Sequence, residues 1–289
     1  MPNIDAMRYV FALMLGLGLA LLPAGRLVRA QGLPDALISA QIVPGWQLSG
    51  GQQMVALHLR LAQHWKTYWR APGAAGVAPR FAWAGSQNLG AVEILWPVPQ
   101  VFDLGGYQTI GYAEELILPI LLTPQDTAQP IAVKLGMDLG ICHDICMPLR
   151  LDLAAALPVQ HLGPKNALIE QALAAQPQSA AAAGLGDVSC TVVPIADGLR
   201  LTADIDLGRE MGRNMDWVGG GYLGVIELPD PDIWVSEVLA QQDQSRLRLT
   251  SDLVPPRGVS LALTRGDIRL TLLHPGGAID LVGCPAPQR

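Results

Sequence analysis

Two of the four cysteines in this 289-residue sequence, Cys142 and Cys146, are separated by only three residues. Such a pair can form a disulfide when the two β-carbons approach to about 4 Å. The ring that it closes is small, so the bond removes little entropy from the unfolded chain. Strained or exposed disulfides tend to be oxidising and to serve catalysis or regulation. The spacing therefore favours a redox-active pair over a structural crosslink.

Thiol–disulfide exchange needs one reachable cysteine to attack and a second cysteine to resolve the mixed disulfide. Either Cys142 or Cys146 could be the attacking thiol. His143 follows Cys142 directly and, when protonated, would favour a thiolate, whereas Asp144 would oppose it. The alternative is that His143 is an ordinary solvated loop residue.

Metal binding is the main competing interpretation of the same stretch. Cys142, His143, Cys146 and Met147 are soft ligands that suit monovalent copper. The spacing is not that of a structural zinc finger, and the Cys-x-x-Cys-His pattern of haem attachment is absent. We therefore expect no resident cofactor, with a Cu(I) site as the alternative.

The N-terminus has the pattern of a secretory signal peptide, predicted to span residues 1–30. Arg8 supplies a positive charge, Tyr9 to Leu22 is apolar, and Val28-Arg29-Ala30 fits a cleavage site. A membrane anchor is the alternative, but it needs about 20 apolar residues. Export would place the cysteines in an oxidising compartment. The formal charge of −6 disfavours nucleic acid as a partner.

The remaining cysteines, Cys190 and Cys284, lie far apart in the sequence. Four cysteines allow three pairings, and the close spacing of the first pair leaves these two for each other. Their disulfide would close a loop of about 90 residues and could stabilise the fold by several kcal/mol in the chain-entropy model. We predict that it is structural.

Hydrophobic residues alternate with polar residues over much of the first half of the chain. This pattern is typical of antiparallel strands with one buried face, and frequent Pro and Gly turns favour a β-sandwich. Strands are predicted at Gln53–Leu61, Ile131–Leu139, Leu149–Leu153, Phe81–Ala84, Ala91–Trp96 and Leu116–Leu122. His58, on the polar face of its strand, and His64 are interpreted as surface or packing residues.

The second half begins with a change of composition. A short helix is predicted at Pro164–Ala175, with Leu168, Ile169, Ala172 and Leu173 on one face, and Gln176–Gly186 is linker-like. Alternation then resumes, which predicts a second, smaller sandwich with strands at Leu199–Leu207, Ser245–Thr250, Val259–Leu263 and Ile268–Leu273. Gly219–Gly221 is expected to be a turn. The predicted order is signal peptide (1–30), redox domain (31–160), helix and linker (161–186) and second sandwich (187–289).

Several motifs together resemble the N-terminal periplasmic region of the DsbD and ScsB thiol:disulfide interchange proteins. They are Trp65-Lys-Thr-Tyr-Trp69, Pro72-Gly73, Trp96-Pro97-Val-Pro99, Gly111-Tyr112, Leu118-Pro119 and Cys142 to Pro148. The resemblance covers Ala36 to Leu157 well and the second sandwich more loosely. It implies an immunoglobulin-like β-sandwich whose redox cysteines are Cys142 and Cys146. It also implies an aromatic cap within Phe102–Tyr112, with Phe102 and Tyr107 as candidates.

The same resemblance implies the partners. The family's membrane domain and thioredoxin-like domain are not part of this sequence, so we expect a membrane-embedded electron donor on a separate chain. The expected acceptors are oxidised thioredoxin-like or client proteins in the periplasm of a Gram-negative bacterium, including factors of cytochrome c maturation. The three-residue spacing of the cysteines places the chain nearer the ScsB-like branch, whose association with copper tolerance keeps the Cu(I) alternative open.

Overall fold

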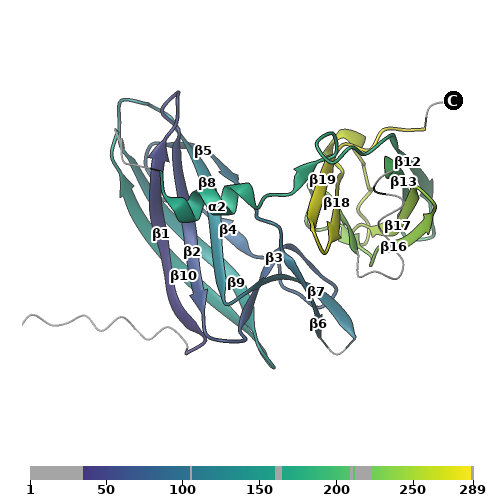
Figure 1. Ribbon diagram of the computed structural model, residues 1–289, viewed down its shortest axis with the longest axis horizontal. Helices are drawn as coiled ribbons and strands as arrows, with labels where there is room; N and C mark the ends of the chain where they lie inside the picture. Colours follow the sequence, from purple (N-terminus) through teal and green to yellow (C-terminus); the bar gives the residue numbers. More distant parts are fainter. Residues whose placement is uncertain (1–34, 105, 160–164, 209–210, 212–222, 288–289) are drawn as a thin grey trace, which may run out of the picture. The chain divides into compact units, whose positions relative to one another are not determined.

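The computed structural model describes residues 35–287, except 105, 160–164, 209–210 and 212–222. β-strands make up most of the regular structure of these residues (Figure 1). The predicted signal peptide, Pro164 and the predicted turn at Gly219–Gly221 lie outside the described residues. Among the described residues, no helix is both long and apolar enough to cross a membrane.

The first sandwich consists of two antiparallel sheets. One sheet has the order β1 (Leu37–Gln47), β2 (Gln53–Leu61), β8 (Glu115–Pro124) and β5 (Leu89–Ile94). The other has the order β10 (Cys146–Leu157), β9 (Ile131–Cys142), β3 (Lys66–Gly73), β7 (Tyr107–Ala113) and β6 (Gln100–Leu104), and β4 (Arg80–Ala82) pairs with β9.

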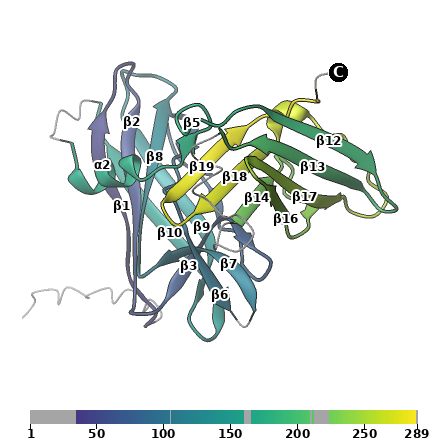
Figure 2. The same ribbon diagram turned by 45° about the vertical axis from the view of Figure 1, so that its right-hand side comes forward.

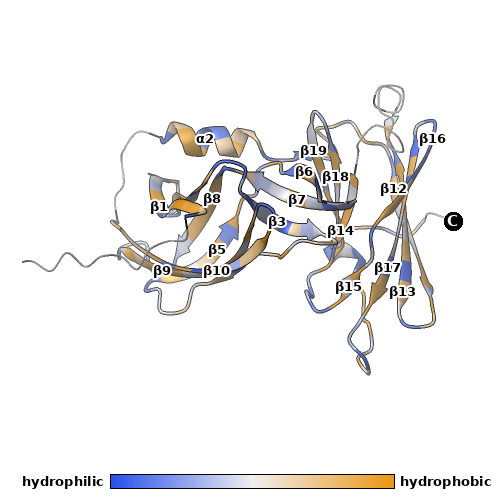
Figure 3. Cartoon of the chain, turned by 90° about the horizontal axis from the view of Figure 1, so that it is seen from below, coloured by the Kyte–Doolittle hydropathy of each residue, from blue (hydrophilic) through white to orange (hydrophobic). Residues whose placement is uncertain are grey.

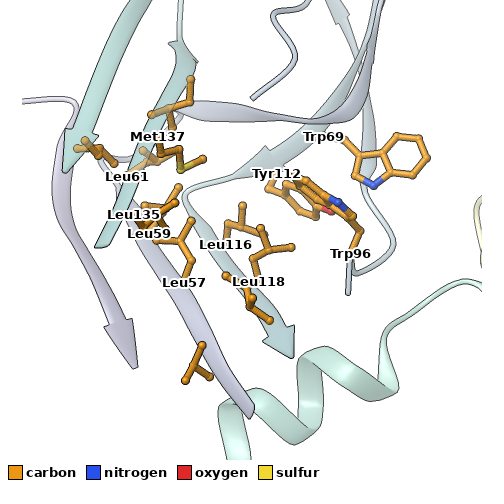
Figure 4. Packing of buried hydrophobic residues seen from close by; sticks show 14 of the residues in the cluster. Leu57, Leu59, Leu61, Trp69, Trp96, Tyr112, Leu116, Leu118, Leu135 and Met137 are labelled. Atoms are coloured by element: carbon orange, nitrogen blue, oxygen red, sulfur yellow. The ribbon is translucent and has the colours of Figure 1, made fainter. Parts of the chain in front are cut away.

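The core of this sandwich is made by the alternate residues that the two sheets turn toward each other. Leucines of β2 face Leu135 and Met137 of β9, and an aromatic group of Trp69, Trp96 and Tyr112 closes one end (Figure 4). The rings of Trp96 and Tyr112 are stacked with their centroids 6.4 Å apart. The buried Tyr112 hydroxyl donates a hydrogen bond to the carbonyl oxygen of Pro97 (2.8 Å), so its polar group is satisfied.

The alternation in the sequence predicted β2, β9 and β10 correctly, but β2 is buried on both faces. The helix α2 (Ala167–Ala174) packs on β8, so that helix, first sheet and second sheet form successive layers (Figure 3). Met54 and Ala56 of β2 form a small separate cluster with Ile169 of the helix. His58, on the same face, is buried, and its Nε2 lies 2.7 Å from Glu115 Oε1, so it is a packing residue.

The helix was predicted, but one residue of its predicted face was wrong. Ile169 and Ala172 are buried, and Leu173 is partly buried against the same cluster, whereas Leu168 is 45% exposed. The helix begins after Asn166, whose side chain accepts a hydrogen bond from the backbone N–H of Leu168 (3.0 Å). In so short a helix only about two turns are available, so the buried stripe is narrow.

Replacing Asn166 by Ala is expected to destabilise the protein by about 1 kcal/mol, because the first turn then loses the acceptor for one of its free N–H groups. Urea unfolding measures the loss. Asn166→Asp, which keeps a capping oxygen, serves as the matched control and should remain near the parent. Equal losses in the two variants would contradict a capping role.

The second sandwich also contains two sheets (Figure 2). The first has the order β11 (Gln178–Ser179), β19 (Gly277–Val282), β18 (Arg269–His274) and β14 (Leu223–Glu227). The second has the order β12 (Val188–Pro194), β13 (Leu199–Asp206), β17 (Arg246–Val254) and β15 (Trp234–Val235), and β16 (Leu239–Asp243) pairs with β17. Cys190 of β12 and Cys284, just after β19, are buried and joined by a disulfide, with their Cα atoms 5.4 Å apart.

One predicted strand of this sandwich is wrong. Val259–Leu263 is irregular chain that precedes the short 3-10 helix η1 (Arg265–Asp267), although Leu261 and Leu263 pack partly against the second core. Alternate apolar residues contact a core here although the segment pairs with no strand. The hydrophobic period alone does not distinguish such an irregular segment from a β-strand. Part of the segment predicted as a linker forms the short strand β11, which pairs with β19. The predicted domain limits stay a prediction. The predicted fold class, two β-sandwiches with a short intervening helix, is confirmed.

Candidate redox site

The β9–β10 hairpin places the two close cysteines directly opposite each other. Cys142 ends β9, Cys146 begins β10, and the register pairs them across a three-residue loop. Their Cα atoms lie 4.2 Å apart, and the two residues form a disulfide. Cross-strand neighbours in antiparallel strands approach to about 4.5 Å where they exchange no backbone hydrogen bonds. The hairpin therefore supplies the proximity that a disulfide needs.

The two sulfur-bearing residues differ sharply in exposure. Leu135, Met137, Leu139 and Ile141 of β9 face the core, so the even-numbered Gly140 and Cys142 face outward from the sheet. Cys142 is nevertheless 0% exposed, while Cys146 is exposed to solvent at the start of β10. An incoming thiol therefore meets Cys146 first.

Tyr68 of β3 covers the buried cysteine. Its hydroxyl oxygen lies 2.8 Å from Cys142 Sγ and 3.2 Å from Cys146 Sγ. The ring fits because Gly140 has no side chain: a β-carbon there would lie 3.0 Å from Tyr68 Cε2 and 3.2 Å from Val77 Cβ. The Thr67 hydroxyl donates to the carbonyl of Gly140 (3.0 Å) and ties the two strands together at this level. Burial raises the pKa of the Tyr68 phenol above its ordinary value.

Sequence reasoning missed Tyr68 as a site residue. The only signal was its place in the Trp65–Trp69 motif, where it could be seen as part of a resemblance but not as a neighbour of the cysteines. The contact depends on the pairing of β3 with β9, in which Lys66 lies opposite Cys142. A strand register between segments about 70 residues apart is set by the tertiary fold.

The predicted cap residues lie on the neighbouring β6–β7 hairpin. The Phe102 ring is partly buried, and the ammonium group of Lys66 lies 4.9 Å from its centre. Tyr107 is 62% exposed. The hydroxyl in hydrogen-bonding distance of the sulfurs belongs to Tyr68 on β3 and not to this hairpin. A capping role for Phe102 or Tyr107 stays a prediction.

His143 lies in the hairpin loop between the cysteines. Its Nδ1 is 2.9 Å from Asp144 Oδ2, and its ring is tilted against Trp65 and His64, with centroids 6.0 Å and 6.1 Å away. The exposed His64 has a left-handed backbone (φ 67°) and its N–H donates to Glu114 Oε1 (3.1 Å). His64 therefore lies beside the disulfide loop, next to the ring of His143.

The structure does not gather the four proposed copper ligands. Met147 follows Cys146 on β10, so its side chain points to the opposite face, where it packs against the first core. Across the described ranges, no group of three or more His, Cys, Asp or Glu side chains has the arrangement of a metal site. The alternation of the strand thus places Met147 on the other face from both cysteines, and the candidate Cu(I) set of Cys142, Cys146, His143 and Met147 stays a prediction.

Strand β3 also carries a charged link to the second sandwich. The Arg70 Nε donates to both carboxylate oxygens of Glu227 on β14 (2.9 and 3.1 Å), and its Nη2 donates to the Thr271 hydroxyl (3.2 Å). The guanidinium stacks over Trp69, 4.0 Å from its centre, and lies 3.7 Å from Asp280. Burial raises the pKa of Glu227, while the charge and hydrogen bonds of Arg70 lower it.

Together, these features define an immunoglobulin-like β-sandwich that holds a disulfide across the end of one hairpin. Residues 37–158 match the family model described as "Thiol:disulfide interchange protein DsbD, N-terminal". Domains of this family are periplasmic and take part in thiol–disulfide exchange with membrane and periplasmic partners. The predicted resemblance is confirmed.

Among solved structures, the chain is similar to the N-terminal periplasmic domain of ScsB from Proteus mirabilis. The TM-score is 0.59 at 24% identity, and the match covers 86% of this chain and 92% of that chain. This similarity concerns the fold and extends over both sandwiches. A second structure, BspA_C_WT, aligns with 7% identity and a TM-score of 0.18, which supports no argument. The comparison with curated proteins found no match.

Proposed function

We propose that this chain is a periplasmic thiol–disulfide exchange protein that passes electrons through Cys142 and Cys146 to oxidised client proteins. The observation that carries the proposal is the unequal exposure of the two cysteines: Cys146 is open to solvent and Cys142 is completely buried behind it. A structural disulfide gains nothing from this asymmetry. An exchange site requires it, because one sulfur must be attacked while the other leaves and later resolves.

The direction of electron flow in this proposal is reductive. A membrane-embedded donor on a separate chain reduces the disulfide, and the dithiol then reduces thioredoxin-like or other client proteins, including cytochrome c maturation factors. The family match of residues 37–158 supports thiol–disulfide interchange as the reaction, and the reductive direction is what the resemblance to the DsbD and ScsB proteins implies. The secretory pattern of residues 1–30 supports the periplasmic location.

The reduced protein is expected to reduce the disulfides of insulin, used as a model client, whereas the Cys142→Ser/Cys146→Ser variant should be inactive. Turbidity from the released insulin chains measures the reaction. A double variant that retains full activity would overturn the proposal. Cys190 and Cys284 are intact in both proteins, so they serve as an internal control.

A redox titration against glutathione separates the proposal from a purely structural disulfide. Structural disulfides of exported proteins have potentials below about −300 mV, and exposed exchange disulfides lie above that range. We expect the Cys142–Cys146 disulfide to titrate above it. A value below it would instead favour a non-catalytic interaction module with two structural disulfides.

A further inference from the structure

The Tyr68 hydroxyl group is a buried polar group that lies directly against the disulfide, although the disulfide itself does not require it. Tyr68 is only 1% exposed, yet its polar group points at the sulfurs, with oxygen–sulfur distances of 2.8 Å and 3.2 Å. In the disulfide neither sulfur carries a hydrogen, so the phenol must be the donor. Gly140 on one side and Gly111 on the other leave room for its strand and ring, since a β-carbon at Gly111 would lie 3.0 Å from Tyr68 Cα.

We propose that Tyr68 is a catalytic residue of the exchange reaction: its hydroxyl stabilises Cys142 as the leaving thiolate and thereby directs an incoming thiolate to Cys146. This inference rests on the proposed function, because it assigns a role within the same reaction. The shorter of the two oxygen–sulfur distances is the one to Cys142, the sulfur that solvent does not reach.

The reaction then balances as follows. A donor thiolate attacks Cys146 Sγ, a donor–Cys146 disulfide forms, and the Cys142–Cys146 bond breaks with its electron pair going to Cys142. The second donor thiol, after losing its proton to solvent, attacks the donor sulfur of the mixed disulfide and releases Cys146 as a thiolate. The donor leaves as a disulfide, and Cys142 and Cys146 have gained two electrons. Transfer to a client is the same sequence in reverse.

Tyr68 acts in this scheme as a hydrogen-bond donor that keeps its own proton. Burial raises the pKa of its phenol, whereas a free cysteine thiol ionises near pH 8.5, so a thiolate cannot deprotonate it effectively. Without a donor, a thiolate at the buried Cys142 would be strongly disfavoured by desolvation. A hydrogen bond to a charged group offsets part of that cost.

Two other polar residues adjoin Cys142 in the strand register and in the sequence. Lys66, itself buried, is the cross-strand partner of Cys142 and adds a positive charge on the same face. His143 follows Cys142 and is paired with the exposed Asp144. These groups remain in place when the hydroxyl alone is removed, so a Tyr68→Phe variant isolates its contribution.

The test compares the parent with Tyr68→Phe, which keeps the ring against Gly140, and with Tyr112→Phe as the matched control. Tyr112 is a second buried tyrosine of the same sandwich, but its hydroxyl bonds to Pro97 and not to a cysteine. The equilibrium with glutathione, and the rate of reduction by dithiothreitol from acidic to alkaline pH, are measured for all three proteins. Circular dichroism establishes that each variant is folded.

Tyr68→Phe is expected to lower the equilibrium constant for reduction of Cys142–Cys146 about tenfold, a potential about 30 mV more negative. It should also move the formation of the thiolate, followed by its ultraviolet absorbance, to higher pH. Tyr112→Phe should change neither quantity. If Tyr68→Phe matches the parent in equilibrium and pH profile, the inference is wrong even when the parent reduces insulin. If the parent fails to reduce insulin, the proposed function fails whatever the small-molecule data show.

Discussion

Replacing Cys146 by Ala is expected to abolish disulfide exchange, whereas replacing Cys142 by Ala should turn the protein into a trap for its partners. In Cys146→Ala the remaining thiol is fully buried under Tyr68, and buried thiols are unreactive. In Cys142→Ala the exposed Cys146 can still attack a client disulfide, but nothing resolves the product. The mixed disulfide should therefore accumulate.

Non-reducing electrophoresis after incubation with oxidised insulin reads out this asymmetry. Cys142→Ala should run as a covalent adduct with insulin that dithiothreitol cleaves, and Cys146→Ala should run as the unmodified protein. Alkylation by iodoacetamide gives an independent control, since only the Cys142→Ala variant should be modified rapidly in the folded state. Adducts of equal yield in both variants would show that the exposure of the two sulfurs does not govern the reaction.

Replacing Arg70 by Met is expected to lower the free energy of unfolding by about 3 kcal/mol at neutral pH, because a buried carboxylate then loses its partner. The side chains of Arg70 and Glu227 are only 14% and 19% exposed. Val225 and Leu273 of the second sandwich belong to the same apolar cluster as the core of the first, so water has little access to the pair. The measurement is urea unfolding followed by tryptophan fluorescence.

The loss should depend on pH in a defined direction. Burial raises the pKa of Glu227 and Arg70 opposes this effect, so Arg70→Met should leave the pKa of Glu227 still higher. A carboxyl group whose folded pKa exceeds its unfolded value binds more protons when folded, and stability then falls as pH rises between the two values. The variant should therefore lose more stability at about pH 7 than at about pH 5.

Two further variants test this explanation. Adding Glu227→Gln to Arg70→Met removes the unpaired charge and should recover part of the loss. Arg200→Met breaks a cross-strand pair with Asp252 of similar geometry but greater exposure, 49% for Arg200, and should destabilise the protein much less than Arg70→Met, because solvent screens an exposed pair. A loss for Arg70→Met that is independent of pH and unchanged by Glu227→Gln would mean that packing over Trp69 is the main contribution.

Local patterns predicted the elements whose hydrophobic period is unambiguous. The predicted strands Gln53–Leu61, Ile131–Leu139 and Leu149–Leu153 lie within β2, β9 and β10, so their positions were correct, although β9 and β10 extend further. The same reasoning failed at Val259–Leu263, where alternate residues contact a core without strand pairing. It also placed Leu168 on the buried face of α2, because the orientation of a short helix is set by the sheet on which it packs.

The sequence by itself determined which two cysteines pair in the hairpin, because two strands joined by a three-residue loop bring them face to face. Only the tertiary structure decided that Cys142 is buried and Cys146 exposed, and that the Tyr68 hydroxyl lies within hydrogen-bonding distance of both sulfurs. Those facts depend on the register between β3 and β9, which are about 70 residues apart in the chain. Hairpin geometry is local and visible in a spacing, whereas burial and cross-strand contact arise only when distant strands pair and the core packs.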